Sequence, residues 1–243
     1  MKKTIFITGA TSGIGKATAE VFAKQGHRLI ICGRRKEVLD NLQIQLSNFT
    51  DVYSLVFDVR NQQEVQNAIN SLPEDWKNID VLVNNAGNAH GLEPISDANI
   101  SDWDAMMDGN VKGLLYVSQP IIKLMKANNS GHIVNISSVA ARQTYANGAL
   151  KKKKKKAVDV ISEGMRLELT EFGIKVTNVQ PGAVETDFSK VRFKGDEERA
   201  ATVYAGYEPL IAEDIADAIS YCVNAPDRVS IAEICIYPKA QAE

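Results

Sequence analysis

The chain has 243 residues, of which 44% are hydrophobic and 24% are charged. These values are ordinary for a globular protein, so they exclude a disordered or fibrous chain, and the length suits one domain with its own buried core. The net charge is −2; without the lysine run Lys151–Lys156, 22 basic residues stand against 30 acidic ones, a balance of −8 that argues against nucleic acid as a partner.

Short apolar runs alternate with longer helical patterns along the whole chain. Most of these runs are near-continuous Val, Ile and Leu, which is typical of parallel strands covered on both faces. We therefore predict seven strands, over Thr4–Thr8, Arg28–Cys32, Val52–Phe57, Val81–Val83, His132–Ile136, Lys175–Val179 and Glu233–Tyr237.

Helical periodicity fills the gaps between these strands. From Ile14 to Phe22, apolar residues recur at i, i+3, i+4, i+7 and i+8, and Gly26 is placed to end that helix. The alternation predicts an α/β fold: a single domain, residues 1–243, with a Rossmann-like, doubly wound parallel sheet and helices on both faces. Further helices are predicted over Glu64–Ser71, Trp103–Met125, Ala157–Phe172 and Ala212–Asn224.

A glycine-rich segment, Thr8–Gly15, follows the first strand and opens the first helix. Its glycines allow a tight turn and a close approach of the backbone to a pyrophosphate, and the helix N-terminus offers N–H donors and a positive dipole end. This placement predicts a dinucleotide site; the alternative is a turn that merely requires glycine.

The second strand ends in Cys32-Gly33-Arg34-Arg35, with no carboxylate. A ribose 2′-hydroxyl is usually met by Asp or Glu at this point, whereas a 2′-phosphate is met by arginine. The forked donors of two guanidinium groups suit a phosphate, so we predict NADP rather than NAD. The alternative is two solvated arginines at a strand end.

Further motifs follow in the order known from one enzyme family. Asn84–Gly87 comes after the fourth strand, Ser138 follows the fifth, and Pro181–Gly182 follows the sixth, with Thr186 four residues later. With these motifs and the glycine-rich segment, the chain resembles the short-chain dehydrogenase/reductase family over nearly its whole length.

The resemblance implies hydride transfer between the nicotinamide of NADP and a carbon of a small-molecule substrate, in a homo-oligomer that is a tetramer. It assigns catalytic roles to Ser138, which hydrogen-bonds the substrate oxygen, to Lys155, which tunes the proton donor and holds the ribose, and to Asn110, which holds a helix kink and a water. The alternative for Ser138 is a strand-end hydroxyl without a catalytic role, and the alternative for Asn110 is a helix-interior amide that is bonded to the backbone. The implied cofactor-binding residues are Gly9, Thr11, Ser12, Gly13, Ile14, Gly15, Arg34, Arg35, Asp58, Val59, Asn85, Ala86, Gly87, Lys155, Pro181, Gly182, Val184 and Thr186.

Within the family, three segments resemble NADP-dependent 3-hydroxy acid dehydrogenases, which act on serine and L-allo-threonine. They are Asp58–Asn61, Leu72–Trp76 and Val191–Asp196. The long connection 188–209 is expected to form a substrate lid, in which Arg192 or Lys194 binds the substrate carboxylate unless these charges face water. Carbonyl or 3-oxoacyl reductases of the same family share much of the pattern and remain an alternative.

Position 151 departs from the family. A tyrosine is expected 13 residues after Ser138, but the chain has Lys151 there, within a run that covers the whole tyrosine motif and leaves Lys155 in place. Three interpretations stay open: an altered or engineered segment, a naturally inactive relative that binds cofactor, or an enzyme with Lys151 as acid/base. Six consecutive lysines would cover every face of a packed helix, which favours the first.

The remaining features of the sequence bear on metal sites, cellular location and rival functions. The three cysteines and three histidines lack ligand spacing, so we expect no metal site and no disulfide framework. No apolar run reaches the roughly 20 residues of a membrane span, and the chain enters a strand pattern at once, so we expect a cytoplasmic protein without a signal peptide. Two functions from other classes stay open, a non-catalytic NADP-binding protein and a methyltransferase-like domain, although the arginine pair speaks against the latter.

Overall fold

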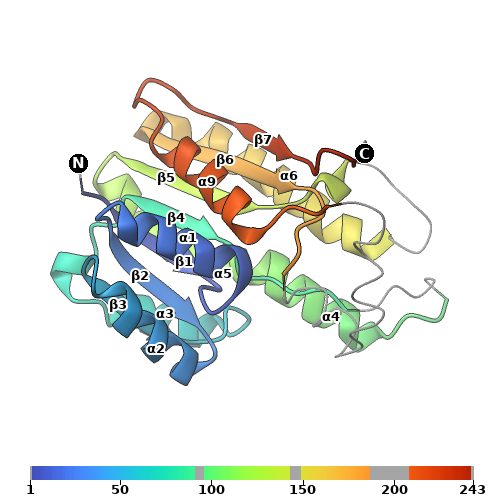
Figure 1. Cartoon of the computed structure of the whole chain (residues 1–243), viewed down its shortest axis with the longest axis horizontal. Helices are drawn as coiled ribbons and strands as arrows, with labels where there is room; N and C mark the ends of the chain where they lie inside the picture. The colour runs from blue at the N-terminus through green and yellow to red at the C-terminus, as the bar shows by residue number, and fades with distance from the viewer. Residues whose placement is uncertain (1, 91–95, 143–148, 187–207, 242–243) are drawn as a thin grey trace.

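The computed structural model describes residues 2–90, 96–142, 149–186 and 208–241, with the backbone alone for residues 149–154. Seven strands form one sheet in the order β3-β2-β1-β4-β5-β6-β7, and every pair is parallel (Figure 1). All seven predicted strands are confirmed, with ends that move by at most two residues: β1 Thr4–Thr8, β2 Arg28–Gly33, β3 Val52–Val56, β4 Val81–Asn84, β5 Gly131–Ile136, β6 Ile174–Pro181 and β7 Glu233–Ile236.

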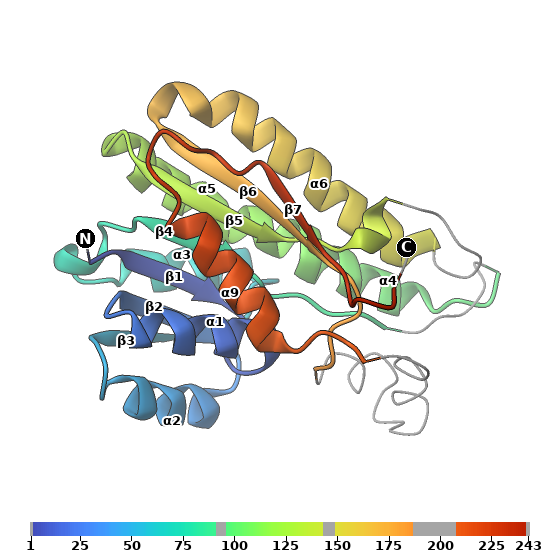
Figure 2. The same ribbon diagram turned by 45° about the horizontal axis from the view of Figure 1, so that its top comes forward.

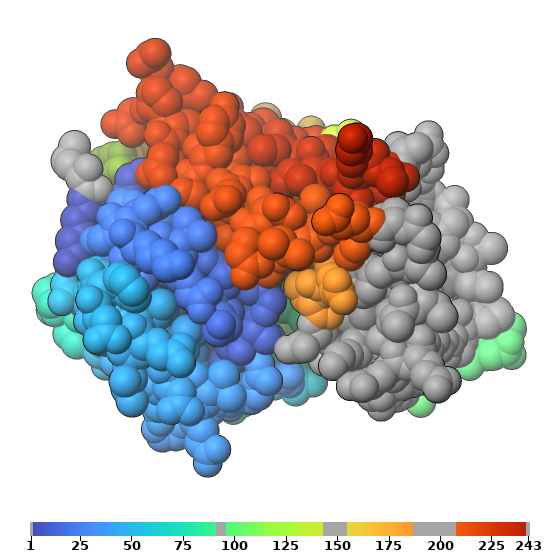
Figure 3. All heavy atoms as spheres, in the orientation of Figure 1, coloured from blue at the N-terminus to red at the C-terminus, as the bar shows by residue number. Residues whose placement is uncertain are grey.

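Helices cover both faces of this sheet, as the doubly wound pattern predicts (Figure 2). One face carries α1 (Gly13–Lys24), α2 (Lys36–Leu46) and α9 (Ala212–Val223), and the other carries α3, α5 and α6. Figure 3 shows α9, in orange-red, against the blue N-terminal segment, and α1 packs directly on α9. The second set runs over Gln62–Asn70 (α3), Gly113–Ala127 (α5) and Ala149–Leu169 (α6).

Two hydrophobic clusters fill the space between the sheet and these helices. Alternate residues of each central strand supply them: Ile5 and Ile7 of β1 face one cluster and Phe6 faces the other. All five side chains of β1 are buried, which explains its continuous apolar run. The strand order reverses between β1 and β4, and such a switch point opens a crevice at the carboxyl ends of the strands.

One helix was not predicted, and two predicted helices have different bounds in the structure. The helix α2 was not predicted, although Leu39, Leu42 and Leu46 recur at helical spacing and are buried. The helix α6 begins at Ala149, eight residues before its predicted start, and passes through the lysine run. The predicted helix Trp103–Met125 is divided into α4 (Ile100–Met107), a π-helical turn η2 (Asp108–Lys112) and α5.

Other elements are short. Glu74–Trp76 (η1), Val139–Ala141 (η3) and Thr170–Phe172 (η4) are 3₁₀ turns. Within the described part of the chain, no helix is long and apolar enough to cross a membrane. Cys32 and Cys222 are buried, as expected for structural thiols, whereas Cys235 is half-buried. The predicted lid, 188–209, falls outside the described residues except at its last two positions.

Candidate active site

The glycine-rich turn joins β1 to α1 at the switch point. Gly9 and Gly13 have φ angles of 66° and 52°, in the left-handed region that favours glycine. A Cβ on Gly15 would stand 2.3 Å from the Gly9 carbonyl oxygen. Ser12 caps α1 with an extended backbone and no side-chain cap hydrogen bond. The N-terminus of α1 therefore presents main-chain donors where a pyrophosphate fits.

The loop after β4 is bonded to the end of β1. Asn85 donates from Nδ2 to the carbonyl oxygens of Thr8 (3.0 Å) and Gly9 (3.2 Å). The hydroxyl of Thr8 accepts from the N–H groups of Asn85 and Ala86, both at 2.9 Å. These bonds place Asn85, Ala86 and Gly87 beside the glycine-rich turn, as the cofactor-binding prediction requires.

The two arginines after β2 differ in their contacts. Arg35 donates from Nη2 to the carbonyl oxygen (3.1 Å) and Oγ1 (2.8 Å) of Thr11, so it braces the glycine-rich turn. The side chain of Arg34 is 63% exposed and forms a long ion pair, 3.7 Å, with Asp58. Both side chains are exposed, but Arg34 is the one that is not bonded to the glycine-rich turn, so its forked donors are the better candidate for a 2′-phosphate.

Asp58 lies between two cations after β3. Arg60 binds its carboxylate through Nη2 (2.6 Å) and Nε (2.9 Å). Burial works to raise the pKa of Asp58, but the hydrogen bonds and charge of Arg60, with the charge of Arg34, hold that pKa below its ordinary value. Val59 packs from the same segment against Gly113, where a Cβ would meet the Val59 side chain at 2.9 Å.

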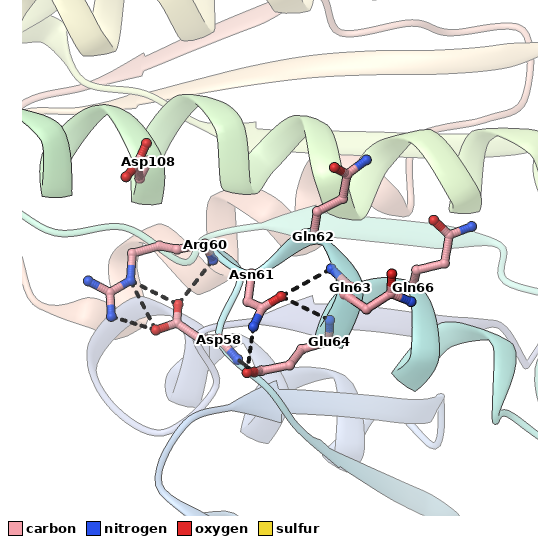
Figure 4. Close-up of a pocket in the computed structure, with 8 residues that line it drawn as sticks. All are labelled: Asp58, Arg60, Asn61, Gln62, Gln63, Glu64, Gln66 and Asp108. Atoms are coloured by element: carbon pink, nitrogen blue, oxygen red, sulfur yellow. Dashed lines mark hydrogen bonds and ion pairs between the residues drawn. The ribbon is translucent and has the colours of Figure 1, made fainter.

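A polar hollow of about 780 Å³ opens beside this segment (Figure 4). Its lining includes neither Ser138, Lys155 nor Asn110, so it is not the centre where proton transfer is expected. Its lining includes Asp58 instead, one of the predicted cofactor-binding residues. The lining residues are Asp58, Arg60, Asn61, Gln62, Gln63, Glu64, Gln66 and Asp108.

Asn110 is buried at the centre of the π-helical turn η2. Its Nδ2 donates to the backbone carbonyl of Met106 (2.8 Å) and to the carbonyl (2.9 Å) and Oδ1 (3.0 Å) of Asn88. A Cβ on Gly87 would stand 2.6 Å from Asn110 Oδ1, so the two segments fit only because residue 87 is glycine. A π-helical turn therefore interrupts the helix where the resemblance implies a kink, and the Asn110 amide is bonded within it.

Ser138 lies directly after β5. Its Oγ donates to the carbonyl oxygen of Pro181 at 3.2 Å and accepts from the N–H of Ala140, also at 3.2 Å. This pairing places Ser138 beside Pro181–Gly182 at the end of β6. In the same region, the side chain of Thr186 lies 3.3 Å from the position of a Cβ on Gly13, and Val184 pairs with Leu210 in a short bridge.

Lys155 projects from α6 toward the end of β5. Its Nζ donates to the carbonyl oxygen of Ile136 at 2.9 Å. Burial lowers the pKa of Lys155 to about 8, although the charge of Asp159 acts in the opposite direction. An amine that titrates near neutral pH is typical of functional sites.

The structure thus brings most of the predicted residues to one edge of the sheet. The side chain of Ile14 points away from this edge and packs on the hydrophobic core. The side chain of Lys151 falls outside the described residues, as do Arg192 and Lys194.

Sequence reasoning missed a buried polar row behind this edge. Asn84, Asn135 and Asn178 lie side by side on β4, β5 and β6, and Asn84 donates to Asn135 Oδ1 at 2.9 Å. It also missed Ser137 and Asp159, which are bonded at 2.6 Å. An asparagine within three apolar strands at the same register was the available signal, because buried amides need partners.

Comparison with known proteins agrees with this architecture. The model of the short chain dehydrogenase family matches residues 3–197. The NADP-dependent 3-hydroxy acid dehydrogenase YdfG of Salmonella typhi is 40% identical over 98% of this chain and 96% of its own. Sulfoacetaldehyde reductase 2 of Chromohalobacter salexigens is 38% identical over 100% of this chain and 96% of its own.

A solved structure extends the likeness to three dimensions. Serine dehydrogenase in its closed form, complexed with NADP+, matches with a TM-score of 0.94 and 38% identity over 99% of this chain and 96% of that one. The chain belongs to the short-chain dehydrogenase family. The predicted resemblance, the fold class and the expectation of NADP as the family's cofactor here are confirmed by these relatives.

Proposed function

We propose that this protein is an NADP-dependent oxidoreductase that transfers hydride between NADP(H) and a small 3-hydroxy acid or its keto form. The observation that carries the proposal is the convergence of three segments at one edge: the bonded turn of Thr8 and Asn85, the Ser138–Pro181 contact and the Lys155–Ile136 contact. An open α/β sheet binds ligands at this edge.

The residues at the edge fit the cofactor. Gly9 and Gly15 let the turn pack tightly, because a Cβ there would meet Ala86 or the Gly9 carbonyl oxygen. The N-terminus of α1, which follows this turn, would offer main-chain donors to the pyrophosphate. Arg34, with most of its side chain exposed, suits the 2′-phosphate. Lys155 would hold the ribose hydroxyls, and Pro181, Gly182, Val184 and Thr186 would line the nicotinamide side. Bound NADP(H) supplies the hydride donor or acceptor.

The side chains divide the remaining work. The hydroxyl of Ser138 would orient the substrate oxygen, because it already lies beside the Pro181–Gly182 loop. Lys155 would keep positive charge near the proton-transfer residue at position 151, which favours the deprotonated form of that group. Asn110 would fix the π-helical turn that packs against α6, since its amide satisfies two carbonyl groups there.

The relatives narrow the class of substrate. A 3-hydroxy acid and sulfoacetaldehyde share one geometry: the carbon that changes oxidation state is one carbon away from an acidic group. We infer that this protein takes substrates of that pattern, with an anion-binding cation from the lid residues Arg192 or Lys194. A general carbonyl or 3-oxoacyl reductase is the rival within the family.

A second candidate function rests on position 151. Lysine stands there instead of the family's tyrosine, so the chain is also proposed as an NADP-binding protein with impaired catalysis. Its neighbour Lys155 would lower the pKa of Lys151 by like-charge repulsion, which reduces the fraction of Lys151 that carries a proton to donate. Binding without turnover separates this function from the first.

A titration and an assay test both candidates. NADPH and NADH are titrated by their fluorescence, and L-serine, L-allo-threonine and sulfoacetaldehyde are assayed for cofactor oxidation or reduction. We expect NADPH to bind at least about tenfold tighter than NADH, equivalent to about 1.4 kcal/mol. Turnover of these substrates supports the first candidate, binding alone supports the second, and failure to bind either cofactor contradicts both.

The proposal also covers the domain organisation, cellular location and oligomeric state of the protein. We propose that residues 1–243 act as one domain, in the cytoplasm, as a homotetramer with a lid at 188–209. The family resemblance supports the tetramer, and light scattering of the purified protein measures its mass directly. A monomer in solution would remove this part of the proposal.

A further inference from the structure

Asp159 lies one helical turn after Lys155 on α6, on the side of the helix that contacts β6. Its Oδ1 accepts three hydrogen bonds, from Ser137 Oγ (2.6 Å), Asn178 Nδ2 (2.8 Å) and Gln180 Nε2 (3.4 Å). Ser137 directly follows β5, and Asn178 and Gln180 lie in the C-terminal half of β6. A carboxylate that is half-buried and triply bonded holds its element firmly in place.

Two of the three donors are next to a candidate site residue. Ser137 precedes Ser138, and Gln180 precedes Pro181, whose carbonyl oxygen accepts from Ser138. The hydroxyl of Ser137 also lies 3.1 Å from the backbone carbonyl of Lys155. Asp159 therefore connects the helix that carries Lys155 with the two strand ends that carry Ser138 and Pro181.

Asp159 also contributes a negative charge to the surroundings of Lys155. Of the described charged groups on the elements packed around Lys155, Arg142 of η3 binds Gln180 (2.8 Å) and Glu233 (3.1 Å). Asp108 and Lys112 of η2 pair with each other at 2.8 Å, and Lys156 on α6 is exposed. Asp159 is the described charge that acts on Lys155, and it acts to raise a pKa that burial lowers.

We infer that Asp159 is a positioning residue of this site: it fastens the helix that bears Lys155 to Ser137 after β5 and to the C-terminal half of β6, and it places a negative charge one helical turn from Lys155. The inference rests on the proposed function, because Lys155 matters through its contact with the cofactor. It concerns a residue outside the motifs that define the family resemblance.

A direct measurement of Lys155 separates this role from a purely structural one. The chain is labelled with ¹³C-lysine, its Cε resonances are followed by NMR from pH 6 to 11, and Lys155→Arg assigns the signal of Lys155. In Asp159→Asn, which keeps the shape but removes the charge, we expect the midpoint of Lys155 to fall by about one pH unit. Glu163→Gln is the matched control, because Glu163 is exposed one turn further along α6 and its loss should leave the midpoint unchanged.

Two further variants keep the test decisive. Asp159→Glu retains the charge and should restore most of the midpoint. Ser137→Ala keeps both charges, removes the shortest bond to Asp159, and should weaken NADPH binding about three- to tenfold, the effect of one ordinary hydrogen bond, because Ser137 acts on the cofactor only through Asp159. It also serves if Asp159→Asn does not fold.

The outcomes distinguish this inference from the proposed function. A Lys155 midpoint that is the same in Asp159→Asn as in the unaltered chain overturns the inference; if that variant does not fold, so does unchanged NADPH affinity in Ser137→Ala. Failure of the unaltered chain to bind NADPH overturns the proposed function instead, whatever the NMR titration shows.

Discussion

The two ends of the candidate active site are held in different ways. At the cofactor end, the path of the main chain decides: the Asn85 amide binds the carbonyls of Thr8 and Gly9, and Gly15 leaves no space for a Cβ. At the catalytic end, ionisable side chains carry the contacts, with Asp159 bonded to Ser137 and Lys155 bonded to the Ile136 carbonyl, between α6 and the end of β5.

This difference bears on how each end tolerates change. A main-chain turn depends on conformation, so one added methyl group displaces it. A side-chain network depends on charge and pairing, so its weak point is a group left unpaired or titrated. Added bulk should therefore disrupt the cofactor end, whereas loss of a charge or a hydrogen bond should disrupt the catalytic end.

Gly15→Ala should break the cofactor end. The added Cβ would lie 2.3 Å from the Gly9 carbonyl oxygen and 2.4 Å from Asn85 Nδ2, so the turn must move. We expect NADPH affinity to fall at least about 100-fold, because an ångström of misplacement at a binding site costs that much. Fluorescence titration measures it.

Gly164→Ala is the matched control for that change. A Cβ at Gly164 meets nothing within 4 Å, so this variant should bind NADPH normally and gain about 0.5–1 kcal/mol in unfolding free energy from helix propensity. Equal losses of affinity in the two variants would contradict the steric account of the turn.

Lys155→Met should change both NADPH affinity and the pH dependence of stability, because it removes the ammonium group at the catalytic end. NADPH affinity should fall about ten- to 100-fold, the value of a charged hydrogen bond. The folded pKa, about 8, is below the unfolded value of 10.5, so folding disfavours the charged form and the unfolding free energy of the unaltered chain rises between these pH values. Urea unfolding at pH 7, 8, 9 and 10 should show that rise, by up to about 1.4 kcal/mol per pH unit, and Lys155→Met should lack it.

Arg34→Asp should change cofactor choice without harming the fold. The Arg34 side chain is 63% exposed, so its removal costs little packing. We expect the preference for NADPH over NADH, about tenfold or 1.4 kcal/mol, to disappear. Arg35→Ala is the informative comparison, because Arg35 braces Thr11 and its loss should weaken both cofactors. An unchanged preference in Arg34→Asp would remove Arg34 from the phosphate site.

His132 lies away from both ends and should act on stability alone. Its Nε2 is 2.7 Å from Thr177 Oγ1, and its Nδ1 has no hydrogen-bond partner among the described residues. Burial lowers the pKa of His132 to about 3, with Lys175 and Lys3 adding to the effect.

The sign of the His132 effect follows from that shift. The unfolded chain binds the proton near 6.5 and the folded chain does not, so unfolding free energy falls as pH drops through this range, by about 1.4 kcal/mol per pH unit. His132→Asn should flatten that slope between pH 6 and 4 in urea titrations. An equal slope in both proteins would mean that His132 is not the group responsible.

Most of the fold was predictable because each strand is a short apolar run bounded by polar or glycine residues. The exceptions have physical causes. The first turns of α6 are lysines, which carry no apolar periodicity, so the sequence gives no signal for a helix start at Ala149. The π-helical turn arises from the amide of Asn110 within an otherwise regular helix pattern, which periodicity does not detect.

The candidate site was predictable where glycines and strand ends define it and not where distant side chains meet. Motif spacing identified Ser138, Asn110 and Lys155 as candidate catalytic residues. Asp159 was missed because its partners, Ser137 and Asn178, are 22 and 19 residues away in sequence and meet it only through the register of β5 and β6.

The most direct test of the account compares the chain with its Lys151→Tyr variant, with NADPH affinity and turnover of L-serine and L-allo-threonine measured on both. An intact cofactor end predicts equal NADPH affinities. A catalytic end that lacks its proton donor predicts that Lys151→Tyr turns over at least about 100-fold faster, the value of general acid/base catalysis. Comparable turnover in the two proteins would contradict the account, because proton transfer would then not depend on position 151.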